Sequence, residues 1–245
     1  DFDSQSSTRK CSTPIFKEQT AQLIEIMQKK TANDLRKLMG ISPKLAELNV
    51  ERYQGWQTES ADCAKQAVLA FKGDVYIGLG AETYGERDFN FSQTNLRILS
   101  GLYGVLRPLD LIQPYRLEMG TKLKTTMGKS LYEFWGQQVT DSLGAELARH
   151  RDKTLINLAS VEYFKAVNPK LLPGETITPI FKDYSNGAYK ILSFFAKKAR
   201  GSMATFIVKN RITKPKDLKS FCEDGYIFNE TFSNDHKWVF TRKAS

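Results

Sequence analysis

Residues 35–49 read Leu-Arg-Lys-Leu-Met-Gly-Ile-Ser-Pro-Lys-Leu-Ala-Glu-Leu-Asn, and this stretch predicts two helices joined by a tight turn. Gly40 is suited to end the first helix, because glycine adopts the left-handed conformation without a Cβ clash. Ser42 is suited to cap the second helix, and Pro43 to be its first residue. The stretch therefore predicts a helix-hairpin-helix within residues 31–53, with a connection of about three residues.

Four leucines are expected to hold these two helices together. Leu35 and Leu38 are spaced to share one face of the first helix, and Leu45 and Leu48 to share one face of the second. Because the connection is short, we expect the helices to pack closely through these side chains.

The turn and the start of the second helix form a candidate phosphate site. The first N–H groups of a helix have no acceptor within it, and the helix dipole places partial positive charge at the same end. Lys44 would oppose that dipole unless an anion were bound. The candidate residues are Arg36, Lys37, Gly40, Ile41, Ser42 and Lys44. The alternative is an ordinary helical hairpin, since a glycine that ends one helix and a Ser-Pro pair that starts the next need no ligand.

The charge of the chain favours a polyanionic partner. Its 245 residues carry 36 Lys and Arg against 27 Asp and Glu, a net charge of +9 with a pI near 9.3. A solvated basic surface is the alternative.

No apolar run approaches the ~20 residues that cross a bilayer. Three distant cysteines do not resemble a disulfide framework, so we expect a cytoplasmic protein, with no membrane partner and with a monomer as the simplest state.

Hydrophobic periodicity predicts long helices interspersed with antiparallel strands, which indicates an α+β or mixed α/β fold. The absence of a linker predicts a single compact domain over residues 1–245, in which the helix-hairpin-helix packs onto a mixed sheet beside a basic cleft. A turn is expected at Asn186-Gly187. The predicted helices are 15–52, 61–71, 88–99, 129–149 and 193–211, and the predicted strands are 74–78, 154–158, 176–183, 189–193, 225–229 and 237–241.

Two further segments contribute candidate basic residues. In residues 100–120, Arg107 and Arg116 are interpreted either as phosphate ligands of a cleft or as partners in buried Arg–Asp or Arg–Glu pairs. In the predicted helix 193–211, a core stripe of Phe195, Ala199, Met203 and Phe206 leaves basic residues on another side, expected to be reachable by solvent. The candidates outside the hairpin are Lys72, Arg107, Arg116, Lys197, Lys198 and Arg200.

Several long blocks resemble the YaaA family of bacterial peroxide-stress proteins, in the same order along the chain. They are residues 71–76, 99–112, 114–120, 132–136, 156–160 and 196–201. The resemblance implies a mixed α/β domain with a helix-hairpin-helix beside a positively charged cleft. It also implies binding to duplex and structured DNA, and a role in surviving hydrogen peroxide, where iron-driven oxidation damages DNA. Family members begin with a hydrophobic strand and a Ser-Pro-Ala-Lys-like segment, so a further segment is expected before Asp1.

Two features of the sequence depart from what standard DNA recognition or catalysis would require. The usual helix-hairpin-helix turn has Gly-hydrophobic-Gly, whereas Ser42 stands at the second glycine here. No metal-binding, nucleotide-binding or nucleophile motif is present, so no cofactor, metal or catalytic residue is assigned. An alternative function is an enzyme for a phosphorylated or anionic small molecule, with a pocket of Tyr76, Arg107, Asp110, Tyr115, Glu162 and Lys165.

Overall fold

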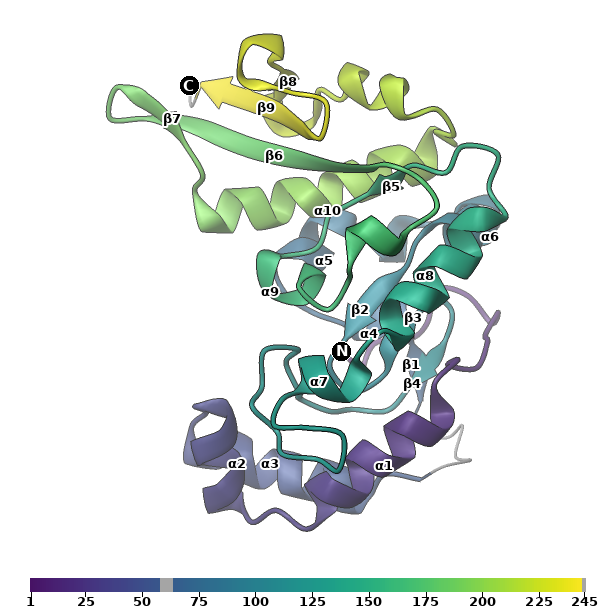
Figure 1. Ribbon diagram of the computed structural model, residues 1–245, viewed down its shortest axis with the longest axis vertical. Helices are drawn as coiled ribbons and strands as arrows, with labels where there is room; N and C mark the ends of the chain where they lie inside the picture. Colours follow the sequence, from purple (N-terminus) through teal and green to yellow (C-terminus); the bar gives the residue numbers. More distant parts are fainter. Residues whose placement is uncertain (58–63, 244–245) are drawn as a thin grey trace. The chain divides into compact units, whose positions relative to one another are not determined.

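The computed structural model describes residues 1–57 and 64–243, and by their internal contacts these form two compact units (Figure 1). The first unit comprises Asp1–Ala70, Arg97–Ser142 and Ser160–Asn168. The second comprises Phe71–Leu96, Leu143–Ala159 and Pro169–Ser245. The expected mixture of helices and strands is confirmed. The expectation of a single domain concerns how the two units combine, and it stays a prediction.

Three helices, α1 (Lys17–Gln28), α2 (Ala32–Met39) and α3 (Pro43–Gln54), form the N-terminal part of the first unit. The helical periodicity predicted for residues 15–52 is confirmed, because Leu23, Ile24 and Met27 are all buried on one side of α1. α2 begins with a capping box, in which Thr31 and Asp34 each bind the other's backbone N–H.

Short strands and helices complete the first unit. β1 (Lys65–Gln66) pairs antiparallel with β4 (Leu111–Ile112), and β2 (Ile98–Ser100) pairs antiparallel with β3 (Gly104–Leu106). The helices are α4 (Ala67–Ala70), α7 (Leu131–Trp135) and α9 (Val161–Phe164), and α8 (Gln138–Ala148) begins in this unit and ends in the second. Trp135 is fully buried and donates to the carbonyl of Gly101 at 3.0 Å.

The second unit is built on a mixed five-stranded sheet. Its path is β5 (Leu155–Ile156), β6 (Thr176–Ser185), β9 (Lys237–Lys243) and β8 (Ile227–Phe228), and β7 (Ala188–Lys190) also pairs with β6. β6 is parallel to β5 and β9, whereas β7 is antiparallel to β6 and β8 to β9. The predicted turn is confirmed, with Asn186 and Gly187 at φ 53° and 81°.

Helix α10 (Ser193–Lys209) covers one face of this sheet, and Figure 1 shows it running along β6. Phe181 and Phe240 of the sheet pack with Ala199 and Met203 of α10 in a buried cluster. Burial of each large side chain contributes roughly 1.5–3 kcal/mol. Phe206 is partly buried against the cluster, as predicted. The expectation for Phe195 was wrong: it is 41% exposed and its ring lies 4.6 Å from the guanidinium of Arg242.

The predicted strand 74–78 is wrong, because helix α5 (Asp74–Leu79) forms there. α5 packs against α10 with almost no space between the backbones. A Cβ on Gly78 would lie 2.0 Å from the carbonyl oxygen of Lys198, and a Cβ on Gly201 would lie 1.9 Å from that of Val75. This close crossing of two helices overrides the strand preference of the β-branched residues.

Other boundaries differ from the prediction by a few residues. α6 (Glu86–Asn95) is shorter than the predicted helix 88–99, whose end forms β2. The helix predicted over 61–71 is reduced to α4 after β1, and residues 61–63 lie outside the described residues. The remaining elements are the 3-10 helices η1 (Ala81–Thr83), η2 (Pro169–Leu171), η3 (Pro215–Ser220), η4 (Glu223–Gly225) and η5 (Glu230–Phe232). Within residues 1–57 and 64–243, no helix is both long and apolar enough to span a membrane.

Candidate nucleic-acid interface

The turn between α2 and α3 has the local geometry that the sequence predicted. Gly40 adopts the left-handed conformation at φ 64° and ψ 35°, and its N–H donates to the carbonyl of Arg36 at 2.9 Å. The Ser42 hydroxyl oxygen accepts the N–H of Leu45 at 3.4 Å, and Pro43 is the first residue of α3. Glycine termination, serine capping and the N-terminal proline are therefore confirmed.

The packing of the two helices differs from the prediction that four leucines hold them. Leu35 is fully buried, but Leu48 is 40% exposed. The buried face of α3 instead carries Ala46, Asn49 and Tyr53, which follow one another at helical spacing. The hydroxyl of Tyr53 donates to the carbonyl of Arg116 at 2.5 Å, and burial raises the pKa of this tyrosine. The hairpin is thus anchored by a tyrosine that the leucine pattern did not reveal.

The turn offers donors for an anion. Among the described residues, the N–H groups of Ile41, Ser42 and Lys44 have no hydrogen-bond acceptor. These N–H groups belong to the turn and to the first turn of a twelve-residue helix, where the dipole is also positive. The Ser42 hydroxyl accepts one bond as a cap and still has a proton to donate.

The cations of the hairpin are available for a partner. Arg36, Lys37 and Lys44 are exposed, and none of them forms a salt bridge with another described residue. Residues 30–44 contain four basic side chains and one carboxylate, that of Asp34. That carboxylate caps the opposite end of α2, where hydrogen bonds from the N–H and hydroxyl of Thr31 lower its pKa. The hairpin residues therefore combine unbonded amides with unpaired positive charge.

Arg107 has a structural partner. Its Nε and NH2 atoms lie 3.1 and 2.9 Å from Oδ1 of Asp110, and NH2 also donates to the carbonyl of Thr13 at 2.8 Å. Asp110 is fully buried and also accepts from the hydroxyl of Ser12 at 2.6 Å. The interpretation of Arg107 as one member of an Arg–Asp pair that holds the loop is confirmed.

Arg116 is more accessible than Arg107. Its NH2 atom lies 2.7 Å from Glu118, and its side chain is 41% exposed. Its Nε atom is buried and has no hydrogen-bond partner among the described residues. An exposed ion pair of this kind contributes only about 0–1 kcal/mol, so the guanidinium can exchange its partner at little cost.

The basic residues of the second unit differ in how they are engaged. Lys72 is exposed. Lys197 and Lys198 lie 3.5 and 3.3 Å from the carboxylates of Asp74 and Asp224. Arg200 was expected to be reachable by solvent; the residue is half-buried, and it donates to the carbonyl of Leu158 at 3.1 Å. Burial accordingly lowers the pKa of the Arg200 guanidinium.

The structure thus places the candidates in separate groups. The six hairpin residues lie together in the first unit, which also contains Arg107 and Arg116, whereas Lys72, Lys197, Lys198 and Arg200 belong to the second unit. The basic cleft that would join these groups stays a prediction.

Of the residues considered for an enzyme, all except Tyr76 belong to the first unit. Within the first unit, Glu162 accepts the N–H of Gly120 at 2.8 Å, and the hydroxyl of Tyr132 donates to the Glu162 carbonyl at 2.9 Å. The Lys165 ammonium lies 4.9 Å from the ring centroid of Tyr132. No role was predicted for Tyr132, although it lies in residues 132–136, one of the segments that resemble the YaaA family. Tyr115 bonds to the hydroxyl of Ser100 at 2.6 Å, and Tyr76 belongs to the second unit.

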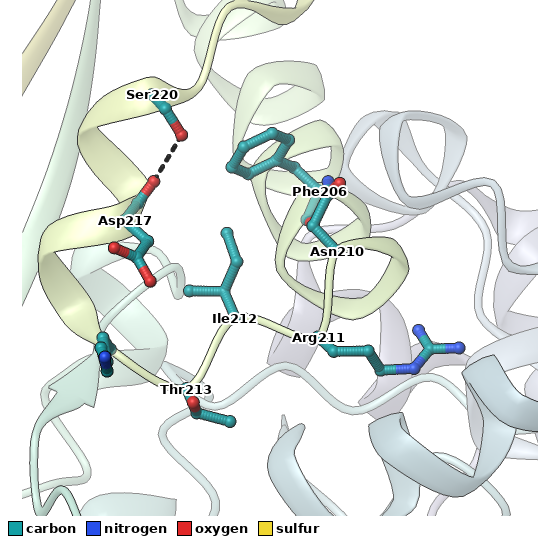
Figure 2. Close-up of a pocket in the computed structure, with 8 residues that line it drawn as sticks. Phe206, Asn210, Arg211, Ile212, Thr213, Asp217 and Ser220 are labelled. Atoms are coloured by element: carbon teal, nitrogen blue, oxygen red, sulfur yellow. Dashed lines mark hydrogen bonds between the residues drawn. The ribbon is translucent and has the colours of Figure 1, made fainter.

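Two of the hollows among the described residues of the second unit contain no predicted site residue. One of 410 Å³ lies beyond the end of α10 and is lined by Phe206, Asn210, Arg211, Ile212, Thr213, Lys214, Asp217 and Ser220. Figure 2 shows the Arg211 side chain extending away from Ile212 and Asp217, in keeping with its ion pair to Asp88. The other, of 550 Å³, includes Trp238 and Lys219, whose ammonium lies 5.1 Å from the Trp238 ring.

Comparison with known proteins places this chain in a family. A family model described as peroxide stress protein YaaA matches residues 1–232. A UPF0246 protein of Saccharophagus degradans is 52% identical over 244 residues, which cover 99% of this chain and 95% of that protein.

Proposed function

The chain belongs to the YaaA family of peroxide stress proteins and has a role in the peroxide stress response, and we propose that it performs this role by binding DNA. The DNA is duplex or structured, and the contacts are made largely to phosphates. Binding shields the DNA, and so protects the cell from iron-driven oxidative damage.

The observation that carries the proposal is the α2–α3 hairpin. Unbonded N–H groups of Ile41, Ser42 and Lys44 belong to the same hairpin as the unpaired cations Arg36 and Lys37. A phosphate would accept hydrogen bonds from these amides and would also favour a lysine at the start of a helix. A structural hairpin also has free N–H groups at the start of its second helix, but it does not require unpaired cations in addition.

The donors of the hairpin suit the phosphate backbone rather than base edges. Backbone amides and flexible lysines bind phosphate oxygens, which are the same for every sequence. A helix that reads bases would enter the major groove with several side chains directed at base edges. The proposed binding is therefore sequence-independent and sensitive to salt.

The test is a titration of fluorescein-labelled duplex DNA at several salt concentrations. The logarithm of the association constant should fall linearly with the logarithm of the salt concentration, with a slope of about −0.9 per neutralised phosphate. Duplexes of unrelated sequence should bind with equal affinity. A single preferred sequence in a footprinting experiment, or an affinity independent of salt, would contradict the proposal.

A second candidate function is action on a phosphorylated or anionic small molecule, and one observation favours it. The buried Nε atom of Arg116 lacks a partner among the described residues, and its guanidinium suits a bidentate phosphate contact. Stabilisation of the chain against heat by pyrophosphate, lost in Arg116→Gln, would support this function. If the protein also failed to bind duplex DNA, the second candidate would replace the first.

A further inference from the structure

The face of β6 that points away from α10 carries a row of aromatic side chains. Side chains alternate along β6, so Phe181 packs with α10 whereas Lys182 and Tyr184 lie on the other face. Tyr189 of β7 is the direct cross-strand partner of Tyr184, and Phe232 of η5 lies beside Tyr189. The ring centroids are 5.2 Å apart for Tyr184 and Tyr189, and 5.7 Å apart for Tyr189 and Phe232.

The two outer rings of this row are open to solvent. Tyr184 is 42% exposed and Phe232 is 46% exposed. Neighbouring rings in the row are inclined at 67° and 68°, so they meet edge to face and are not stacked in parallel on one another. An aromatic side chain that is nearly half exposed offers a surface on which another planar ring can stack once a flexible lysine moves aside.

Two lysines flank the rings. The ammonium of Lys182 lies 5.2 Å from the ring centroid of Phe232, and that of Lys243 lies 6.0 Å from the ring centroid of Tyr184. Neither lysine forms a salt bridge with another described residue, whereas Lys197, Lys198 and Lys209 each do. The carboxylate nearest in sequence, that of Asp183, is buried and bonded to Tyr226 and Arg242. The ammonium groups of Lys182 and Lys243 are therefore not engaged in an ion pair among the described residues.

Rings that can stack, together with unpaired cations, match a partner that presents flat bases and phosphates at once. In a duplex the base faces are covered by their neighbours, so only an unpaired strand can stack on protein side chains. We propose that this surface, the aromatic sheet face (Lys182, Tyr184, Tyr189, Phe232 and Lys243), binds single-stranded DNA. Bases stack on Tyr184 and Phe232, and the two lysines bind the adjoining phosphates.

The aromatic sheet face lies in the second unit, whereas the hairpin lies in the first. The choice of DNA rather than RNA as the partner rests on the proposed function, but the stacking itself does not. Duplex binding by the hairpin and single-strand binding by the aromatic sheet face can therefore fail independently, and each has its own probe.

The test is fluorescence anisotropy with the full chain and an oligothymidylate of about 15 nucleotides. The double variant Tyr184→Leu, Phe232→Leu removes the rings but keeps apolar side chains. Its affinity for the oligothymidylate should fall by about tenfold or more, because each base stack contributes substantially to binding. Its affinity for duplex DNA should not change. The variant Tyr184→Phe, Phe232→Tyr retains the rings and should bind as the parent does, as should the control Leu171→Ala, which changes another exposed side chain of this unit.

Two measurements on the unmodified protein keep the test decisive if a variant folds poorly. An abasic oligonucleotide of the same length should bind much more weakly than the oligothymidylate, and photocrosslinking of an iodouracil-containing strand should label Tyr184 or Phe232. Equal binding of the abasic strand, unchanged affinity of a folded leucine variant, crosslinks only outside this face, or tighter binding of oligouridylate would each overturn the proposal.

Discussion

The carboxylate of Asp88 and the guanidinium of Arg211 form an ion pair of 2.7 Å that ties the first turn of α6 to the residues following α10. The Lys209 ammonium lies 2.7 Å from the other oxygen of the same carboxylate, which also accepts the N–H of Gly85. Burial raises the pKa of Asp88, but the hydrogen bonds from Lys209, Gly85 and Arg211 outweigh it and lower that pKa to about 2.

This ion pair predicts a pH dependence of stability. Because the pKa is lower in the folded state, ionised Asp88 stabilises the protein above the ordinary carboxyl pKa of 3.8, and the contribution is lost as the pH falls towards 2. Asp88→Asn should therefore reduce the free energy of unfolding more at neutral pH than near pH 3. Urea unfolding at both pH values measures this. An equal reduction at the two values would show that the charge of Asp88 does not contribute.

Gly40→Val should destabilise the hairpin. A Cβ at this position meets no atom within 4 Å, so the cost comes from the left-handed backbone, roughly 1–2 kcal/mol. Because the turn holds the free amides, affinity for duplex DNA should fall as well. Gly40→Asn is the control, since asparagine adopts this conformation more readily. Thermal unfolding and duplex titration measure the two effects, and a valine variant as stable as the asparagine variant would contradict the argument.

Lys44→Glu should lower the affinity for duplex DNA by roughly tenfold, or about 1.4 kcal/mol, and reduce the salt slope by about 1. The lysine is exposed and unpaired, so thermal stability should change little. Lys216→Glu makes the same change in net charge at an exposed position of η3 and is the matched control. Equal losses in the two variants would indicate a general charge effect and would exclude the hairpin as the interface.

Lys197 and Arg200 should respond differently to charge reversal, although both were predicted on the basic side of α10. Arg200→Glu removes the donor to the Leu158 carbonyl and should cost about 1–3 kcal/mol of stability. Lys197→Glu breaks only an exposed pair with Asp74 and should change stability by about 0.5 kcal/mol or less. Urea unfolding compares them. Under the DNA proposal, Lys197→Glu also weakens duplex binding. This loss of affinity can be attributed to the charge because the variant retains its fold.

Prediction from the sequence was accurate where a conformation depends on nearby residues. The hairpin turn and the 186–187 turn were both located, since glycine and asparagine adopt positive φ and Ser-Pro starts a helix. The helical and strand segments were mostly recognised from their periodicity. The candidate residues of the hairpin were brought together because they are contiguous in the chain.

Prediction failed where distant residues decide the outcome. The segment 74–78 has strand-forming residues, but it is a helix because Gly78 and Gly201 allow α5 and α10 to approach closely. Leu48 follows a helical apolar pattern, yet the buried face of α3 is that of Tyr53, whose partner Arg116 is 63 residues away. Neither contact produces a local signal in the sequence.

The sequence by itself determined the capped hairpin, the mixture of helices and strands, the net positive charge and the family resemblance. All of these follow from residue type and short-range spacing, since φ preferences and capping bonds act over a few residues. The tertiary structure decided which cations are already neutralised, which apolar residues remain exposed and which rings form the aromatic sheet face. Burial and ion pairing depend on partners such as Asp88 and Arg211, 123 residues apart, and their energies exist only once the chain has folded.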